Sequence, residues 1–174
     1  GRRKAAELEI REVLGRPPER RPVSTVQRGE KMIGIHPYVA FRGNCREAID
    51  FYKQALGAEE IYAQTYGDSP MSEMGAADAI MHCTIKVGDT NIMMCDDFHS
   101  PNFTTGGNIS LAIGMNEVDR AKEVFANLSD GGNVTMPIDK TFWAEAFGMV
   151  TDKFGINWMV NCDAPQTETE KAAA

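Results

Sequence analysis

The side chains in this chain that could do acid–base chemistry are few. Histidine occurs three times, and His36 and His82 fall within segments of strand-like sequence. An imidazole titrates near neutral pH, so a histidine beside a carboxylate can act as a base held in one tautomer. We predict His82 and Asp96 as such a catalytic pair. The alternative is that the two residues form a structural hydrogen bond or a solvent-exposed pair.

The four cysteines, Cys45, Cys83, Cys95 and Cys162, include no C-x-x-C pair. Zinc ribbons and thioredoxin-like sites both need such pairs, so both are excluded. We expect reduced thiols, with Cys83 and Cys95 packed as small buried hydrophobic residues.

Charge is unevenly distributed along the 174 residues. Residues 1–31 carry nine Lys or Arg against five Asp or Glu, so a total of −7 leaves −11 for the rest. An acidic body argues against nucleic-acid binding, and no apolar stretch approaches the roughly 20 residues that cross a bilayer. We therefore expect a cytoplasmic protein with neither a nucleic-acid nor a membrane partner.

Glycine and prolines break residues 15–31. We predict that residues 1–31 are a basic N-terminal extension or linker, that one domain spans 32–163, and that 164–174 form a disordered tail. A solvated tail is the expected role of the basic segment, and an interaction arm is the alternative. One hypothesis is that Met32 is the natural start, which would make the extension non-native.

Within the predicted domain, one order of elements occurs twice: a strand, a helix and three strands. The first helix is predicted over 45–56, with Asn44 as a cap, Glu47 completing a capping box and Gly57 as its end. The second is predicted between a cap at Asn116 and the glycines 131–132. The predicted strands are 35–41, 60–66, 79–87 and 90–96 in the first round and 108–115, 133–139, 142–152 and 156–161 in the second.

The repeat extends to the helix faces. The side chains of Ala48, Phe51 and Tyr52 recur as Ala121, Val124 and Phe125 at a constant spacing. Two βαβββ modules, at about 34–96 and 108–162, are therefore predicted, giving an α+β fold whose mixed sheets form a cupped pocket.

Two motifs are the most specific in the chain: N-x-x-E-A-I-x-F-Y-x-x-x-L-G at 44–57 and D-x-F-G-x-x-W at 152–158. With the segments around them, over about 34–162, they resemble the PhnB-like branch of the vicinal-oxygen-chelate superfamily of glyoxalases, bleomycin-resistance proteins and dioxygenases. The resemblance implies paired βαβββ modules, commonly a homodimer, in a bacterial protein. Members are often described as ubiquinone-biosynthesis methyltransferases. This chain has no Gly-rich strand-to-helix turn for S-adenosylmethionine, so methyl transfer is not expected.

Metal-dependent relatives place His or Glu at four inward positions, one on the first and last strand of each module. The positions matching these are His36 on the first strand, Met93, Met94 or Cys95 with Asp96 just beyond on the fourth, Asn108 or Ser110 on the fifth, and Met159 on the last. Only His36 is a convincing ligand. Even if Asp96 is added, two ligands do not hold a catalytic ion. We expect neither a metal nor another cofactor.

Strand alternation places other polar side chains toward the cup. The predicted ligand-binding residues are His36, Tyr38, Asn108, Ser110, Trp143, Phe147, Asn157 and Met159. We expect Trp143 to form a stacking wall, with burial in the core as the alternative, and Trp158 to be core. The first functional hypothesis is a metal-free protein that binds an organic small molecule. The alternative is a metal-dependent lyase, isomerase or dioxygenase.

Overall fold

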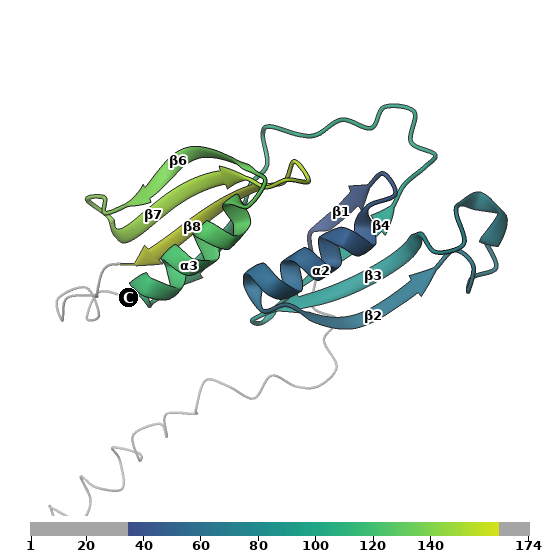
Figure 1. The fold of residues 1–174 in the computed structure, drawn as a ribbon, viewed down its shortest axis with the longest axis horizontal. Coiled ribbons are helices and arrows are strands. Elements are labelled where there is room, and N and C mark those ends of the chain that lie inside the picture. The colour runs from purple at the N-terminus through teal and green to yellow at the C-terminus, as the bar shows by residue number, and fades with distance from the viewer. Residues whose placement is uncertain (1–34, 164–174) are drawn as a thin grey trace, which may run out of the picture. The chain divides into compact units, whose positions relative to one another are not determined.

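The structure is a computed structural model and describes residues 35–163. The predictions for residues 1–31 and 164–174 lie outside that range. Along the chain the elements are β1 (Tyr38–Phe41), α2 (Cys45–Leu56), β2 (Glu59–Thr65), the short 3₁₀ helix η1 (Ser72–Met74), β3 (Ile80–Val87), β4 (Thr90–Asp96), β5 (Leu111–Met115), α3 (Val118–Ser129), β6 (Asn133–Asp139), β7 (Ala144–Thr151) and β8 (Asn157–Asp163) (Figure 1).

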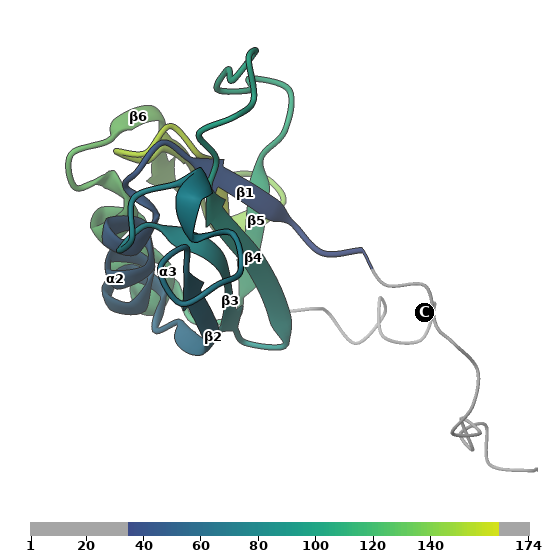
Figure 2. The same cartoon turned by 90° about the vertical axis from the view of Figure 1, so that its right-hand side faces the viewer.

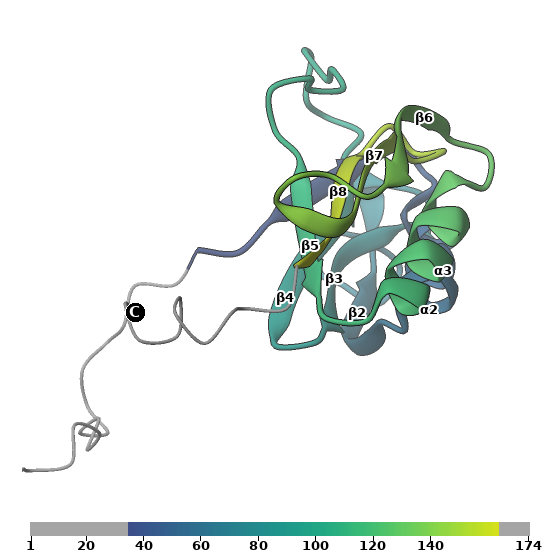
Figure 3. The ribbon, with the colours of Figure 1, turned by 90° about the vertical axis from the view of Figure 1, so that its left-hand side faces the viewer.

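Each module forms one four-stranded mixed sheet, in the order β1-β4-β3-β2 or β5-β8-β7-β6. The first and last strands of a module pair in parallel, and the other neighbours pair antiparallel. One helix packs against each sheet, and α2 and α3 lie side by side (Figures 2 and 3). This arrangement confirms the predicted α+β fold of two βαβββ modules.

The two modules share one hydrophobic core. The apolar stripes of the helices are buried: Ala48, Ile49, Tyr52 and Ala55 on α2, and Ala121, Val124, Phe125 and Leu128 on α3. An aromatic cluster joins the modules, since Phe154 from the second packs edge-on against Phe41 and Phe51 of the first, with ring centroids 5.9 and 5.6 Å apart. The predicted core residue Trp158 is 3% exposed.

The helix ends differ from the predicted caps. Asn44 occupies the N-cap position of α2 but makes no side-chain cap hydrogen bond, and Glu47 pairs instead with Lys153, at 2.8 Å. The carboxylate of Asp96 acts as the cap acceptor instead, because it accepts a hydrogen bond from the Cys45 N–H at 3.0 Å. The predicted capping box is therefore wrong, because a carboxylate from β4 supplies the acceptor. Gly57, with φ of 67°, ends the helix in the left-handed conformation as predicted.

Other boundaries also shift. The N-cap of α3 is Glu117 rather than Asn116, and it too makes no side-chain cap hydrogen bond. The strands β1 and β5 begin at Tyr38 and Leu111, later than predicted. Trp143 precedes β7 rather than lying within it. Within residues 35–163, no helix is both long and apolar enough to cross a membrane.

Candidate functional site

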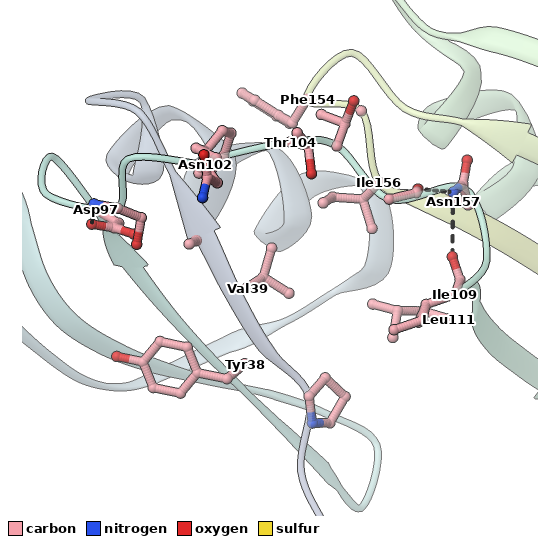
Figure 4. Close-up of a pocket in the computed structure, with 17 residues that line it drawn as sticks. Tyr38, Val39, Asp97, Asn102, Thr104, Ile109, Leu111, Phe154, Ile156 and Asn157 are labelled. Atoms are coloured by element: carbon pink, nitrogen blue, oxygen red, sulfur yellow. Dashed lines mark hydrogen bonds between the residues drawn. The ribbon is translucent and has the colours of Figure 1, made fainter.

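A cavity of about 510 Å³ lies where the two modules meet. Its walls come from β1, the 97–107 loop, the start of β5 and the turn before β8 (Figure 4). The lining residues are Pro37, Tyr38, Val39, Ala40, Asp97, Ser100, Asn102, Phe103, Thr104, Thr105, Gly106, Ile109, Leu111, Phe154, Gly155, Ile156 and Asn157. Apolar walls therefore surround a few polar groups, as in sites for organic molecules.

The 97–107 loop is fixed at several points. The Arg42 guanidinium donates to the Ser100 carbonyl at 2.6 Å and lies over the Phe103 ring, 4.7 Å from its centroid. At the far end, Asn157 Nδ2 donates to the carbonyls of Gly106, at 2.9 Å, and Ile109, at 3.2 Å (Figure 4). These contacts hold the loop over the cavity without a helix or strand.

Asp97 is the one formally charged side chain among the described lining residues. Hydrogen bonds from the Ser100 side chain and from the backbone N–H groups of His99 and Ser100 lower the pKa of its carboxyl to about 2. The carboxylate is therefore ionised throughout the physiological range, and the rest of the cavity wall is neutral.

The turn that forms the opposite wall is organised by one buried carboxylate, Asp152, which is 3% exposed. Its Oδ1 accepts the N–H groups of Phe154 and Ile156, at 2.9 and 3.0 Å. Its Oδ2 accepts the Tyr52 hydroxyl from α2 and the indole N–H of Trp158, both at 2.8 Å. Burial and the neighbouring carboxylate raise the pKa of Tyr52 far above its ordinary value. Asp152 thus ties the cavity wall of the second module to the helix of the first.

Each sheet has a face turned away from its helix, here called its open face. The first open face consists of Tyr38, Ala40, Tyr62, Gln64, His82, Thr84, Met93 and Cys95, and the second of Ala112, Gly114, Met136, Asp139, Phe147, Met149, Met159 and Asn161. Tyr38 lies opposite Met93 in the register, Met93 opposite Thr84, and Thr84 opposite Tyr62. The first open face borders the cavity at Tyr38.

A hydrogen-bonded cluster occupies the first open face. The Tyr38 hydroxyl lies 3.1 Å from His82 Nδ1, and the Thr84 hydroxyl lies 3.4 Å from His82 Nε2. The Tyr62 ring centroid is 6.1 Å from that of His82. The imidazole therefore sits among two phenols and a hydroxyl on a surface that remains partly exposed.

Two side chains of this open face, Tyr38 and Cys95, have raised pKa values. Burial, followed by a hydrogen bond with Cys95, raises the pKa of Tyr38 to about 12. Burial also raises the pKa of the Cys95 thiol, while the contact with Tyr38 acts in the opposite direction. The phenol and the thiol are accordingly protonated at neutral pH. The prediction that Cys83 is buried is confirmed, but Cys95 is only partly buried.

The predicted catalytic pair is not brought together. Asp96 is buried on the helix side of its sheet, and its oxygens accept the N–H groups of Gly43, Cys45 and Ile80, at 2.8 to 3.0 Å. His82 points to the opposite face and contacts Tyr38 and Thr84 instead. A catalytic role for His82 stays a prediction, and its partner in this structure is Tyr38.

The predicted ligand-binding residues divide into several groups. Tyr38 and Asn157 line the cavity. Ser110 lines a second cavity of about 530 Å³ between the β3–β4 turn and β5. Trp143 is 47% exposed and packs near Phe147 with ring centroids 5.5 Å apart, and Phe147 and Met159 belong to the second open face. His36 and Asn108 are exposed and line neither cavity.

Among residues 35–163, no three His, Cys, Asp or Glu side chains gather closely enough to hold a metal ion. The donor set on the four strands equivalent to metal-bearing strands explains this. Their open-face side chains are Tyr38, Ala40, Met93, Cys95, Ala112, Gly114, Met159 and Asn161, without a carboxylate or imidazole. This set does not fit the His and Glu ligation of metal-dependent relatives.

Sequence reasoning missed most of the cavity walls. The 97–107 loop contributes Asn102 and Thr104, and no periodic pattern predicts the path of such a loop. Phe154 and Ile156 were detectable, because the D-x-F-G-x-x-W motif contains Asp152 and Trp158, which fix the turn between them.

Comparisons with known proteins agree with this architecture. A family model described as 3-demethylubiquinone-9 3-methyltransferase matches residues 33–161. Protein YjdN of Escherichia coli is 36% identical over 138 residues, covering 73% of this chain and 93% of YjdN. The crystal structure of PA1353 from Pseudomonas aeruginosa has 39% identity and a TM-score of 0.70, covering 76% of this chain and 98% of that chain. A PhnB protein from Bacillus cereus, called a putative 3-demethylubiquinone-9 3-methyltransferase, shares the fold, with 23% identity, a TM-score of 0.66, and coverage of 75% and 99%.

Proposed function

Since this chain belongs to the family described as 3-demethylubiquinone-9 3-methyltransferase, the PhnB-like branch of the vicinal-oxygen-chelate superfamily, we propose that it is a metal-free small-molecule-binding protein. Its organic ligand occupies the cavity between the modules and extends onto the first open face at Tyr38. The cavity carries this proposal, because its roughly 510 Å³ falls within the range of small-molecule sites.

The character of the lining supports a neutral organic ligand. Val39, Leu111 and Ile156 point into the cavity from three different segments (Figure 4). Asn102 and Thr104 supply hydrogen-bonding groups from the loop above them. Apolar walls give affinity through burial, while a few polar groups select the orientation of the ligand.

Methyl transfer, which the family description names, is not part of the proposal. Rossmann-like methyltransferases bind their cofactor at the carboxyl ends of an open parallel sheet, beside a Gly-rich turn. In residues 35–163 both sheets are mixed, with one parallel pair each. Calorimetric titration with S-adenosylmethionine should give no saturable heat. A saturable heat whose size is proportional to the protein concentration would contradict this part of the proposal.

We further propose a homodimer in the bacterial cytoplasm, in which a second copy covers exposed apolar side chains. Tyr62 on the first open face is 50% exposed. Phe142 and Trp143 are 97% and 47% exposed, and their rings stack edge-on 4.5 Å apart. Exposed aromatic groups of this size are typical of interfaces. Sedimentation equilibrium should show a dimer, which Phe142→Asp weakens.

Ligand binding is tested by a thermal-shift screen of neutral carbonyl and aromatic compounds, followed by calorimetry. Ile109, 70% exposed, lines the cavity, and Ile61, 54% exposed, does not, so Ile109→Arg and Ile61→Arg are matched variants. Compounds that bind the wild type should lose affinity at least tenfold in Ile109→Arg and not in Ile61→Arg. Equal loss in both variants, or a screen without binders, would contradict the proposal.

The second candidate is a metal-dependent lyase, isomerase or dioxygenase. The imidazole of His82 on the first open face favours it, because imidazole can ligate an ion or act as a base. Plasma mass spectrometry of protein purified without chelator distinguishes the two. About one ion per chain, lost in His36→Ala or His82→Ala, would support the enzyme, whereas metal well below that ratio supports the metal-free site.

A further inference from the structure

Cys95 lies beneath a bridge made by two other side chains of the first open face. Tyr38 is on β1 and His82 is on β3, and β4, which carries Cys95, runs between these two strands. The Tyr38 hydroxyl reaches His82 Nδ1 at 3.1 Å, so it must cross β4. Continuing the β3–β4 register from Cys83 opposite Met94 sets His82 opposite Cys95. The thiol, the phenol and the imidazole are thus neighbours on one face.

These groups form a chain along which a proton can move. The Tyr38 hydroxyl lies 3.1 Å from His82 Nδ1, the Thr84 hydroxyl lies 3.4 Å from His82 Nε2, and Cys95 adjoins Tyr38 and His82 on the same face. For a relay in one tautomer, the thiol gives its proton to the phenol oxygen, the phenol donates to Nδ1, and Nε2–H donates to Thr84. Such a chain lets an imidazole act as the general base for a thiol that it does not touch.

Cys95 also differs from the other three cysteines in its accessibility. Cys45, Cys83 and Cys162 are all buried, with exposed fractions of 0%, 0% and 1%. Cys95 is partly exposed and lies on the open face next to Tyr38, which lines the cavity. Of the four cysteines, it is therefore the one that a ligand extending from the cavity onto the open face can reach.

Resting on the proposed binding function, we propose that Cys95 is a nucleophile, that Tyr38 and His82 relay its proton, and that the ligands it captures are planar α,β-unsaturated carbonyl compounds. The rings of Tyr38 and His82 offer flat surfaces on which a planar conjugated molecule can stack. Conjugate addition suits the site because it needs neither a leaving group nor a second reactant.

The step balances within the site. The thiol proton passes to Tyr38 as the phenol proton passes to His82. The sulfur electron pair forms a C–S bond to the β-carbon, and the C=C π pair moves toward the carbonyl as an enolate. The proton then returns from His82 through Tyr38 to the α-carbon. One S–H and one C=C bond are consumed, and one C–S and one C–H bond are formed.

The test uses the full chain and N-ethylmaleimide, a small α,β-unsaturated carbonyl compound. Intact mass and peptide mapping should show one adduct, at Cys95 and absent in Cys95→Ser. The wild-type rate should rise less steeply with pH than that of an unassisted thiol, which gains about tenfold per pH unit up to its own pKa. At pH 7, Tyr38→Phe should slow the reaction about 100-fold and restore the steeper rise.

The control is Tyr62→Phe, which alters the same face but bonds only Gln64, at 2.9 Å. This variant should react like the wild type. An adduct at another cysteine, or a Tyr38→Phe rate equal to that of the wild type, would overturn the proposal. Because maleimide reacts without a natural ligand, this result is independent of the Ile109→Arg binding test, and either proposal can fail alone.

Discussion

The two modules share one topology, but their open faces carry different chemistry. On the first, the Tyr38 hydroxyl meets His82 across β4, and Cys95 lies beside them on the same face. At the positions equivalent to Tyr38, His82 and Cys95, the second face has Ala112, Phe147 and Asn161. The duplicated scaffold therefore provides one face with titratable groups and one that is mostly apolar. The difference restricts the acid–base chemistry that we propose to the first module, while the second module contributes cavity walls.

The buried carboxylates differ in a parallel way. Within residues 35–163, Asp96 accepts hydrogen bonds only from backbone groups of its own module. Asp152 accepts from its own module and also from Tyr52 of the other. Through Asp152 the second module therefore contributes a buried polar contact between the modules, beside the exposed Lys153–Glu47 pair, and shapes the cavity wall.

The largest stability effect is expected from removing that contact. Asp152→Ala leaves the Tyr52 hydroxyl, the Trp158 indole and two backbone N–H groups without their acceptor. The free energy of unfolding should fall by about 3–5 kcal/mol, measured by urea denaturation. Tyr52→Phe, which removes one donor, should cost about 1.5–3 kcal/mol. A loss below about 1 kcal/mol in Asp152→Ala would show that Asp152 does not hold the modules together.

A smaller effect is expected at alkaline pH. The folded protein raises the pKa of Tyr52, through burial and Asp152, and that of Tyr38 to about 12. A phenol in the unfolded chain titrates near 10, so the unfolded state loses its proton first. The stabilisation is present below about pH 10 and is lost as pH rises through the folded pKa. Urea midpoints should therefore decline above pH 10, and less steeply in Tyr52→Phe. Parallel declines in both proteins would contradict the role of Tyr52.

The smallest stability effect is expected on the first open face itself. Tyr38 is 53% exposed, so Tyr38→Phe should change the free energy of unfolding by less than about 1 kcal/mol. In an absorbance titration, the folded Tyr38→Phe variant should nonetheless lack one phenol that ionises at about pH 12 in the folded wild type. Loss of a phenol that ionises near 10 would mean that Tyr38 is not in contact with Cys95 and is not partly buried.

Much of the fold could be predicted from the sequence because each element is locally consistent. The predicted cap residues Asn44 and Gly57 mark the observed bounds of the first helix, and the predicted bounds of β4 and β6 also match. The hydrogen bond at the start of α2 could not be predicted, because the acceptor for the Cys45 N–H is Asp96, which is distant in the chain. Rules based on residue spacing cannot predict that an acceptor from another strand replaces the local cap.

The candidate site was less predictable, and for two different reasons. Strand alternation places Asp96 with the buried Ile92 and Met94, which was sufficient to separate it from His82. In contrast, nothing local indicates that Tyr38 spans β4 to reach His82, or which side chains of the 97–107 loop line the cavity. Contacts made through loops and across strands depend on the assembled fold.

The most direct test of the central claim is a methyl-labelled NMR titration of the full chain with compounds that pass the thermal-shift screen. We expect saturable shifts at the methyl groups of Val39, Leu111 and Ile156 in the cavity. No shifts are expected at Met136 and Met149 on the second open face. Shifts confined to those methionines, with the cavity methyls unchanged, would contradict the assignment of ligand binding to the cavity between the modules.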